Sequence, residues 1–599
     1  MQQERRTGRK HDGQECLTDD LPILEVLGLA GLGLADVDII VSSFQAAGPG
    51  AVGMQRPLVA EGFSHFDPYD PRHFTVSHHR AHAASAAFAS GFSHCATLVS
   101  DLAGSTTTDG EDFFLPFAEV EARYRQDPGA QGVRTEMRSI YRFLDGDLEL
   151  LERDFGGSHN QPDVHVVSEA SLYENMSQLI FRRGHAHGQL MALAGLSDGA
   201  GSPVSLADLV DSQEQPRLRN GWQFHVRSGS VEELAPVAHV TQEAFAAVLV
   251  GQVERAMRVS GCRDLAAAGG VFLNLPANTL IADHPDVDRY YVPSAPHDAG
   301  ISLGCAHLGH AHLATTYRPR AVTTDFLGPL PVQHAADLDE LSCMVGEGDE
   351  RALIRRVAEL LCAGELIFRI AGRAEFGPRA LGNRSILGHP THCRHARDRL
   401  NQIKSRQPWR PVAPLTLESH CQVLFEGPAT SPFMNMNYRV RPEHAQDLHE
   451  VVHADGTARV QTVPDDDPGF VAGLVRYLAA SAHVPVLLNT SLNGPGQPII
   501  NDIGEAVSFA RRSGVRYLLT DSGLHEIPVT SLVTLPADTA LLKIGASGGT
   551  VVSLHGSNVP VERATFEYLC TSFEFDAMSF SAGDYERLRR VCAEASVHG

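Results

Sequence analysis

Strand-like and helix-like segments alternate along most of this chain, and this alternation limits its fold more than any other feature. Residues 78–92 are rich in alanine and end near a glycine, which predicts a helix, and the apolar run at 95–101 predicts a buried strand. The same alternation includes residues 21–36, 37–43, 245–261, 263–275 and 288–294. Repeated strand–helix units favour α/β layers that bind ligands at the ends of their strands.

The proline-containing stretch at 311–335 has little periodicity and predicts a domain boundary. We therefore expect a first domain at 1–325, a second at 336–535 and a tail at 536–599. Residues 119–170 are rich in charge and turn formers, so we expect an excursion from the core that shapes a pocket for an acceptor.

Lysine is rare in this chain, and its placement excludes one way of binding ATP. Of the 49 basic residues, three are lysines (Lys10, Lys404 and Lys543) and 46 are arginines. None of the three follows a glycine, so the phosphate-binding loop GxxxxGK[ST] cannot occur. Lys404 is notable because a compact, flexible cation stands where this composition would usually place an arginine.

Charge and cysteine usage exclude several classes of protein. The formal charge of −23 opposes nucleic-acid or membrane-surface binding, which needs basic patches. The ten cysteines form no CxxC pair, which excludes zinc ribbons and fits reduced thiols. No long uncharged apolar run and no signal-peptide pattern is present, so we expect a soluble, cytoplasmic protein.

His78 and His82 are four residues apart on the predicted helix, so both imidazoles project from one face. Asp101, at the end of the next strand, offers an oxygen ligand. Histidine and carboxylate without thiolate suit iron, manganese or zinc. His79 stands where a metalloprotease HExxH motif has glutamate, which excludes that chemistry. Among 30 histidines such a pair also arises by chance, so spacing alone leaves a metal-free alternative open.

The sequence around these histidines resembles the NodU/CmcH family of O-carbamoyltransferases. The resemblance rests on SHHRAHAASAAFASGF (77–92), SDLAG (100–104), GQLMALAG (188–195), AAGGVFLN (267–274) and HDAGISLGCA (297–306). It implies a first domain similar to the tRNA-threonylcarbamoylation ATPase, with an actin/Hsp70-like (ASKHA) fold. The implied metal ligands are His78, His82, Asp101 and Asp298, with Fe(II) or another divalent ion. Gly269, Gly270 and Asn274 are implied to lie beside a nucleotide.

A second group of motifs is similar to the YrdC-type domain, which forms acyl-adenylates from ATP. Arginine forks and glycine-rich backbone suit oxyanions. The pattern consists of four parts: GRAEFGPRALGNRS (372–385), the KxR pair Lys404 and Arg406, DGTARVQTV (455–463), and the SxN pair Ser491 and Asn493. The resemblance implies catalytic roles for Lys404, Arg406, Arg459, Ser491, Asn493 and Arg379, and cofactor binding by Arg373 and Glu375.

The combined resemblance implies a two-site enzyme. Carbamoyl phosphate and ATP, with Mg, would form carbamoyl-adenylate in the second domain. The first domain would transfer the carbamoyl group to a hydroxyl of a small molecule, which we expect to be a natural product. A homodimer is compatible with this scheme. Family members begin with a strand hairpin that this chain, starting at QQERRTGRKHD (2–12), would lack.

Three other functions were weighed. A non-catalytic nucleotide- or metal-binding relic is favoured by the expected loss of the hairpin. A threonylcarbamoyl-type tRNA-modifying enzyme would share both folds, but the negative charge opposes it. A hydrogenase-maturation enzyme would need paired CxxC motifs. The histidine-rich stretch at 389–398 is interpreted as a polar loop that leads into a helix.

Overall fold

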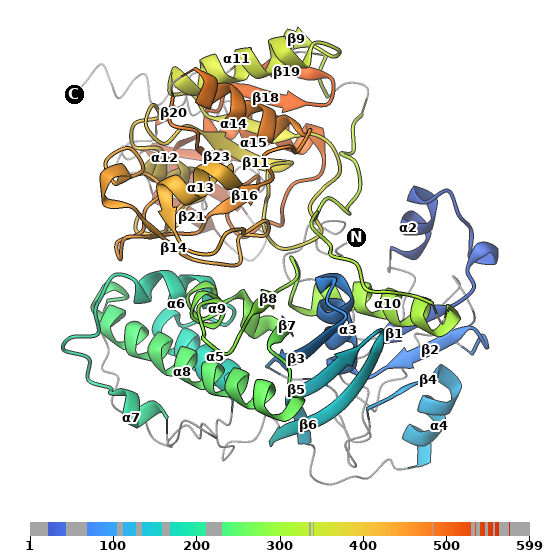
Figure 1. Ribbon diagram of the computed structural model, residues 1–599. Coiled ribbons are helices and arrows are strands. Elements are labelled where there is room, and N and C mark those ends of the chain that lie inside the picture. Colours follow the sequence, from blue (N-terminus) through green and yellow to red (C-terminus); the bar gives the residue numbers. More distant parts are fainter. Residues whose placement is uncertain are drawn as a thin grey trace. The chain divides into compact units, whose positions relative to one another are not determined.

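The computed structural model describes residues 22–43, 67, 69–102, 104, 112–126, 134–157, 168–210, 230–314, 316–334, 337–339, 341–481 and 483–528, and five short strands beyond 528. The chain divides into two compact units (Figure 1). Unit 1 comprises Met1–Pro329, Glu375–Arg379 and Trp409–Asp467, and unit 2 comprises Leu330–Ala374, Ala380–Pro408 and Pro468–Gly599. Two later segments of the chain therefore belong to unit 1, an interleaving that the sequence did not indicate.

A five-stranded sheet forms the centre of unit 1. Its order is β6 (Asp147–Gly157), β5 (Arg134–Leu144), β3 (His94–Ser100), β7 (Asp264–Ala268) and β8 (Arg289–Tyr291). The last three strands are parallel, and β5 is antiparallel to both of its neighbours. The carboxyl ends of β3 and β7 therefore meet at one edge of the sheet, where loops can present side chains to a ligand.

Helices cover both faces of this sheet. On one face, α3 (His78–Ser90) and α10 (Ile301–Leu313) pack with Val99 and alternate β7 residues, and on the other α8 (Ala235–Ser260) packs with Leu98. Leu98 and Val99 contact different helices because successive side chains of a strand point to opposite faces of the sheet. Helices α3 and α10 pack so closely that a Cβ atom on Gly304 of α10 would lie only 1.9 Å from the Ala81 carbonyl oxygen.

Unit 1 contains further elements besides this sheet and the helices that cover it. Before the sheet lie α2 (Ile23–Leu29), β1 (Ile40–Ser43), β2 (His73–Val76), β4 (Phe114–Pro116) and α4 (Phe117–Gln126). Further helices are α5 (Glu169–Phe181), α6 (His187–Ala194), α7 (Leu206–Leu209) and α9 (Leu275–Ala282). The later segment adds β12 (Ala413–Leu417), α13 (Glu418–Leu424), β13 (Phe425–Glu426), β14 (Tyr438–Val440), β15 (Thr457–Ala458) and β16 (Gln461–Val463).

Unit 2 has its own mixed sheet. Its strands run in the order β17 (Leu487–Ser491), β11 (Arg384–Gly388), β10 (Ile367–Ile370), β18 (Tyr517–Thr520), β19 (Gly523–Glu526) and β9 (Ser342–Gly346). Its helices are α11 (Glu350–Cys362), α12 (Ala396–Ile403), α14 (Phe470–Ala480) and α15 (Ile503–Ser513). In the segment expected to be a tail, β21 (Ala540–Ile544), β22 (Gly549–Leu554) and β23 (Ser557–Val561) form an antiparallel sheet, and β20 (Val533–Thr534) pairs with β24 (Glu574–Phe575).

Several sequence-based expectations are confirmed. Helix α3 begins at His78 and is closed by Gly91, whose φ of 73° is easily adopted only by glycine. Strand β3 follows directly, and α8 ends at Gly261 with φ 69°. A mixed α/β architecture is therefore confirmed, whereas the assignments to ASKHA and YrdC-like folds stay predictions.

The prediction of an excursion from the core at 119–170 was wrong for the described residues of that segment. Strands β5 and β6 belong to the central sheet, and residues Arg138–Leu144 of β5 pair with the whole of β3. The charges that made this segment resemble a loop are held in ion pairs, such as those of buried Arg138 with Asp154 and Glu169. A buried, paired charge and a solvated charge look the same in a sequence.

One helical stretch, Glu232–Ser260, is long and apolar enough to cross a membrane by length and composition alone. Buried residues along α8, including Phe245 and Leu249, belong to the hydrophobic core of unit 1. Its apolar character is therefore explained by burial inside the protein.

Candidate metal centre and anion-binding cluster

Four side chains from three segments of unit 1 converge at the carboxyl end of β3. His78 and His82 lie one turn apart on α3, Asp101 follows β3, and Asp298 begins the short turn that leads into α10. Their ligand atoms all lie within 4.8 Å of one another. Helix periodicity aligns the two imidazoles, and the close packing of α10 on α3 brings Asp298 to them.

The distances between these side chains are those of a compact group. The Nε2 atom of His82 lies 3.1 Å from Oδ2 of Asp101 and 3.4 Å from Oδ1 of Asp298. The corresponding distances from Nε2 of His78 are 3.6 Å and 3.4 Å. Both imidazoles are buried, whereas the Asp298 side chain is 57 % exposed. The group is thus closed on the protein side and reachable from solvent at Asp298.

Burial and charge act in opposite directions on these groups. Burial lowers the pKa of His78, but hydrogen bonds to the two aspartates outweigh it and raise that pKa to about 10. Burial raises the pKa of Asp101, yet the two histidines bring it down to about 2. The pKa of Asp298 is lowered for the same reason. Two carboxylates facing two imidazoles make a site that favours added positive charge.

The donor set fits a divalent transition metal. Two imidazole nitrogens and two carboxylate oxygens, without thiolate, suit iron, manganese or zinc. Nε2 of His82 and Oδ2 of Asp101 are buried and make no hydrogen bond of good geometry within the described residues. A metal ion would satisfy both atoms, because each would then point a lone pair at the cation.

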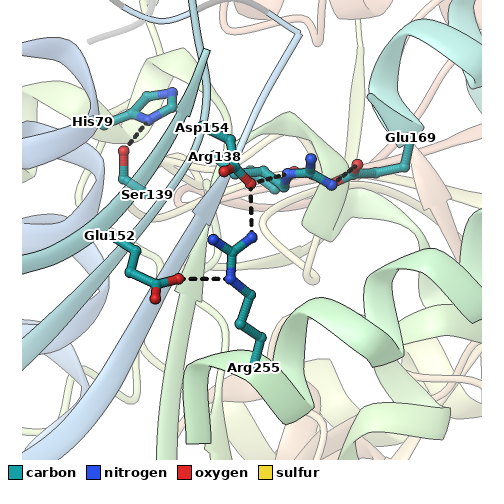
Figure 2. A network of polar contacts seen from close by, with 8 residues as sticks. His79, Arg138, Ser139, Glu152, Asp154, Glu169 and Arg255 are labelled. Carbon is teal, nitrogen blue, oxygen red and sulfur yellow. Dashed lines mark hydrogen bonds and ion pairs between the residues drawn. The ribbon is translucent and has the colours of Figure 1, made fainter. Parts of the chain in front are cut away.

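A buried polar network supports the helix that carries the histidines. Ser139 of β5 and Nδ1 of His79 lie 2.7 Å apart (Figure 2). On the other side of the ring, a Cβ atom on Gly104 would lie 2.5 Å from Nε2 of His79. Burial lowers the pKa of His79, so this imidazole is neutral. His79 therefore anchors α3 to the sheet, whereas His78 and His82 of the same helix face the metal centre.

Charged residues extend this network along the sheet. Figure 2 shows Arg138 between Asp154 and Glu169, each at 3.2 Å. Arg255 of α8 reaches Glu152 at 2.6 Å and Asp154 at 3.1 Å. The roles of these residues could not be predicted from the sequence, because the strands at 134–157, which carry Arg138, Glu152 and Asp154, were not predicted.

The glycines expected beside a nucleotide have a packing role in this structure. Gly269 has φ 107°, and a Cβ atom there would lie 1.9 Å from the Ser100 carbonyl oxygen. Asn274 caps α9 by accepting a hydrogen bond from the Ala277 amide at 3.1 Å, and its amide group pairs with Gln242. Gly270 lies next to Asp101. Nucleotide binding by these three residues stays a prediction.

In unit 2 the structure brings together the lysine and the SxN pair. The ammonium group of Lys404 donates to Oγ of Ser491 at 3.0 Å, to its carbonyl oxygen at 2.6 Å, and to Oδ1 of Asn493 at 2.7 Å. Lys404 directly follows α12, and Ser491 ends β17. This lysine is 8 % exposed, so its cation is held in a fixed place at the end of a strand.

The neighbouring arginines have different surroundings. Arg406 donates from Nε to Asn401 at 2.5 Å. Arg384 is fully buried and donates to Asn501 and to the carbonyl groups of Ala371 and Gly372, which holds the 371–384 loop together. Arg373 is exposed, and its carbonyl oxygen accepts from Asn383.

Three residues expected in the second domain group with unit 1: Glu375, Arg379 and Arg459. The segment that carries the first two is held by Asp325, whose carboxylate accepts from the Gly377 amide. Burial and the nearby charge of Arg410 lower the pKa of Arg379 to about 10. His297, next to Asp298, has its pKa lowered by burial, with a smaller effect from Arg379. The charge of Arg379 therefore acts on the residue that precedes Asp298.

Comparison with known proteins relates this chain to carbamoyltransferases. Residues 358–526 match the family model described as "Carbamoyltransferase C-terminus". This part of the chain is therefore similar to a carbamoyltransferase C-terminal domain. The matched region contains all the arginine, KxR and SxN motifs described above, whereas the four candidate metal ligands precede it.

Curated relatives match longer stretches of the chain than the family model does. Nodulation protein NolO of Bradyrhizobium diazoefficiens is 34% identical over 275 residues, which cover 45% of this chain and 50% of that protein. Nodulation protein U of Rhizobium tropici is 31% identical over 359 residues (58% and 56%). The 3'-hydroxymethylcephem-O-carbamoyltransferase of Amycolatopsis lactamdurans is 30% identical over 347 residues (55% and 62%). The matches thus span about half the length of these relatives.

A solved structure, of T. kodakarensis HypF, also matches, with a TM-score of 0.19 and 14% identity over 37% of this chain and 31% of that one. This similarity is too low to bear on the fold. The relationship to carbamoyltransferases therefore rests on sequence, and homology to a curated O-carbamoyltransferase supports a transferase.

Proposed function

We propose that this chain is an ATP-dependent O-carbamoyltransferase that uses carbamoyl phosphate as its carbamoyl source. The observation that carries the proposal is the coincidence of the carbamoyltransferase C-terminal match with the fixed Lys404–Ser491–Asn493 cluster inside it. We assign the cluster to a YrdC-like fold and the metal centre to an ASKHA fold.

The first reaction belongs to the cluster in unit 2. Water hydrolyses carbamoyl phosphate to carbamate and phosphate, a carbamate oxygen then attacks the α-phosphorus of ATP to form carbamoyl-adenylate, and pyrophosphate leaves as its Mg complex. Both reactants are anions and repel each other, so a preplaced cation lowers the barrier. Lys404 supplies that charge at the end of β17, where Ser491 and Asn493 hold its ammonium group. Arg406 and Arg373 add positive charge from the same unit.

The second reaction belongs to the metal centre in unit 1. A hydroxyl oxygen of a small-molecule acceptor attacks the carbamoyl carbon, and AMP leaves. His78, His82, Asp101 and Asp298 would hold Fe(II) or a similar ion, which supplies Lewis acidity when bound. Arg379 places a positive charge nearby, where it can hold the phosphate of the adenylate.

The acceptor is proposed to be the hydroxyl group of a natural product. One relative is named for carbamoylation of a hydroxymethylcephem, and others are nodulation proteins. These names support a small-molecule alcohol as the class of acceptor, without selecting one compound.

The test is pyrophosphate release from ATP with and without carbamoyl phosphate. We expect release that depends on carbamoyl phosphate, and a fall of about 100-fold or more in Lys404→Met, which keeps the side-chain stem but removes the charge. Arg355→Met is the matched control, because Arg355 lies on the exposed face of α11 in the same unit. Unchanged release in folded Lys404→Met would contradict the proposed role of the cluster.

A further inference from the structure

Three potential metal ligands gather in unit 2, within the fold that carries the lysine cluster but outside that cluster. Cys362 is the last residue of α11, His392 lies in the loop between β11 and α12, and His483 lies in the loop between α14 and β17. The ligand atoms of all three lie within 4.8 Å of one another. The three residues come from sequence positions up to 121 apart (483 − 362), so the fold alone brings them together.

The geometry of the two imidazoles fits a shared cation. Nε2 of His392 lies 3.2 Å from Nδ1 of His483, and the two rings stand at 80° with centroids 5.1 Å apart. In a tetrahedral site with metal–nitrogen bonds of about 2.05 Å and a metal–sulfur bond of about 2.3 Å, neighbouring ligand atoms lie about 3.3–3.6 Å apart. The observed nitrogen separation needs almost no adjustment to meet that requirement.

Neighbouring groups hold the loops in this arrangement. His389 packs against both histidines, with ring centroids 4.6 Å from His392 and 6.2 Å from His483. Its Nε2 lies 3.1 Å from the Val484 carbonyl oxygen, and its Nδ1 accepts from the Thr391 amide at 3.2 Å. Because both of its nitrogens are engaged, His389 serves as a fixed support between the two loops and leaves the cation to the other three residues.

We propose that Cys362, His392 and His483 bind a divalent transition-metal ion of the zinc type. One thiolate and two imidazoles are the ligands that Zn²⁺ prefers, and three protein ligands leave one position for water. The structure confirms the expected loop before a helix at residues 389–398. The proposal adds a role for one histidine of that loop as a metal ligand.

The ion would connect the end of α11 to the loop after β11 and to the loop before β17, the neighbouring strand of the sheet. An ion that binds the folded chain but not the unfolded chain stabilises the fold by mass action. This proposal does not depend on the proposed carbamoyl transfer, because it uses none of the residues of the lysine cluster or the metal centre in unit 1.

The test uses Co²⁺ as a spectroscopic probe on the full chain, stripped of metal and kept reduced. A thiolate bound to Co²⁺ gives a charge-transfer band, whereas the site of His78, His82, Asp101 and Asp298 contains no thiolate. The band therefore reports only the proposed site. We expect its final intensity to correspond to one thiolate-bound Co²⁺ per chain, and we expect the band to disappear in Cys362→Ser and to be lost on addition of Zn²⁺. His392→Asn and His483→Asn should weaken Co²⁺ binding at least about tenfold.

Two variants are matched controls. Cys343→Ser removes an exposed thiol elsewhere in unit 2, and His78→Ala alters the other candidate site; both should keep the band. A second measurement, the rise in Tm with Zn²⁺, should be smaller in Cys362→Ser than in Cys343→Ser, because only the unit 1 site is left to bind the ion in the former. The absence of a thiolate band in the wild-type chain, or its persistence in Cys362→Ser, would overturn the proposal and leave an N–H···N hydrogen bond between the two histidines.

Discussion

His82 Nε2 and Asp101 Oδ2 lie 3.1 Å apart, although one belongs to the interior of a helix and the other to the end of the following strand. The contact exists because α3 lies on the sheet with its histidine face towards the carboxyl edge of β3. Both atoms are buried, and a bound metal ion would engage the two of them at once. This relationship gives the metal centre its first and most direct test.

Asp101→Asn should weaken metal binding at the unit 1 site at least about tenfold, because it removes a charged ligand while keeping the shape. Equilibrium dialysis with Fe²⁺ or Co²⁺ measures the effect. Asp286→Asn is the control, since Asp286 is 60 % exposed in a surface ion pair. Pyrophosphate release should survive in Asp101→Asn, because that reaction belongs to unit 2. Equal metal affinities in the two variants would contradict the assignment of Asp101 as a ligand.

Metal binding and pH should be coupled through His78, whose pKa is raised to about 10 by its aspartate neighbours against the effect of burial. In the metal-free chain, this raised pKa stabilises the fold fully below about pH 6.5 and less as pH rises towards 10. A metal needs neutral imidazole, so its stabilising effect grows over the same interval. The difference in Tm between metal-loaded and metal-free protein should therefore increase from about pH 6 to about pH 9. A constant difference would argue against His78 as a ligand.

Gly269→Ala should destabilise the chain strongly. Its φ of 107° is unfavourable for alanine, and the added Cβ would lie 1.9 Å from backbone at Ser100. We expect a loss of about 3 kcal/mol or more in the free energy of unfolding, measured with urea. Gly261→Ala shares the positive φ, at 69°, but has nothing within 4 Å, so it should cost only about 1 kcal/mol. Similar losses in both variants would show that the close contact has no effect.

Arg138→Met should cost about 3–5 kcal/mol of unfolding free energy, because it leaves buried Glu169 without its ion-pair partner. Adding Glu169→Gln should recover part of the loss, as expected for coupled neighbours. Arg142→Met, which breaks an exposed pair with Glu149, should cost at most about 1 kcal/mol. Equal costs for the buried and exposed arginines would contradict the described network.

The sequence allowed some of this structure to be predicted. Alanine-rich composition and Gly91 defined α3, and the four-residue spacing placed His78 and His82 on one face. Asp298 lies 216 residues after His82 (298 − 82), so no periodicity could bring it to the site, and its inclusion came from family resemblance. The structure does bring these four residues together.

Other features depended on tertiary pairing that local patterns do not encode. The charges of β5 looked like those of a loop because their partners, such as Glu169, lie on other elements. Arg379 was expected with the lysine cluster, yet its segment groups with unit 1 through the contact of Gly377 with Asp325. His392 was interpreted from its neighbours in sequence, whereas Cys362 and His483 come from elsewhere in the chain.

The most direct measurement of the proposed function is the identity of the nucleotide products formed from ATP in the presence of carbamoyl phosphate. If unit 2 forms carbamoyl-adenylate, ATP is cleaved between its α- and β-phosphates, and pyrophosphate appears together with carbamoyl-adenylate or AMP only when carbamoyl phosphate is added. Cleavage of ATP to ADP and phosphate would contradict the account. Pyrophosphate release that does not depend on carbamoyl phosphate would also contradict it.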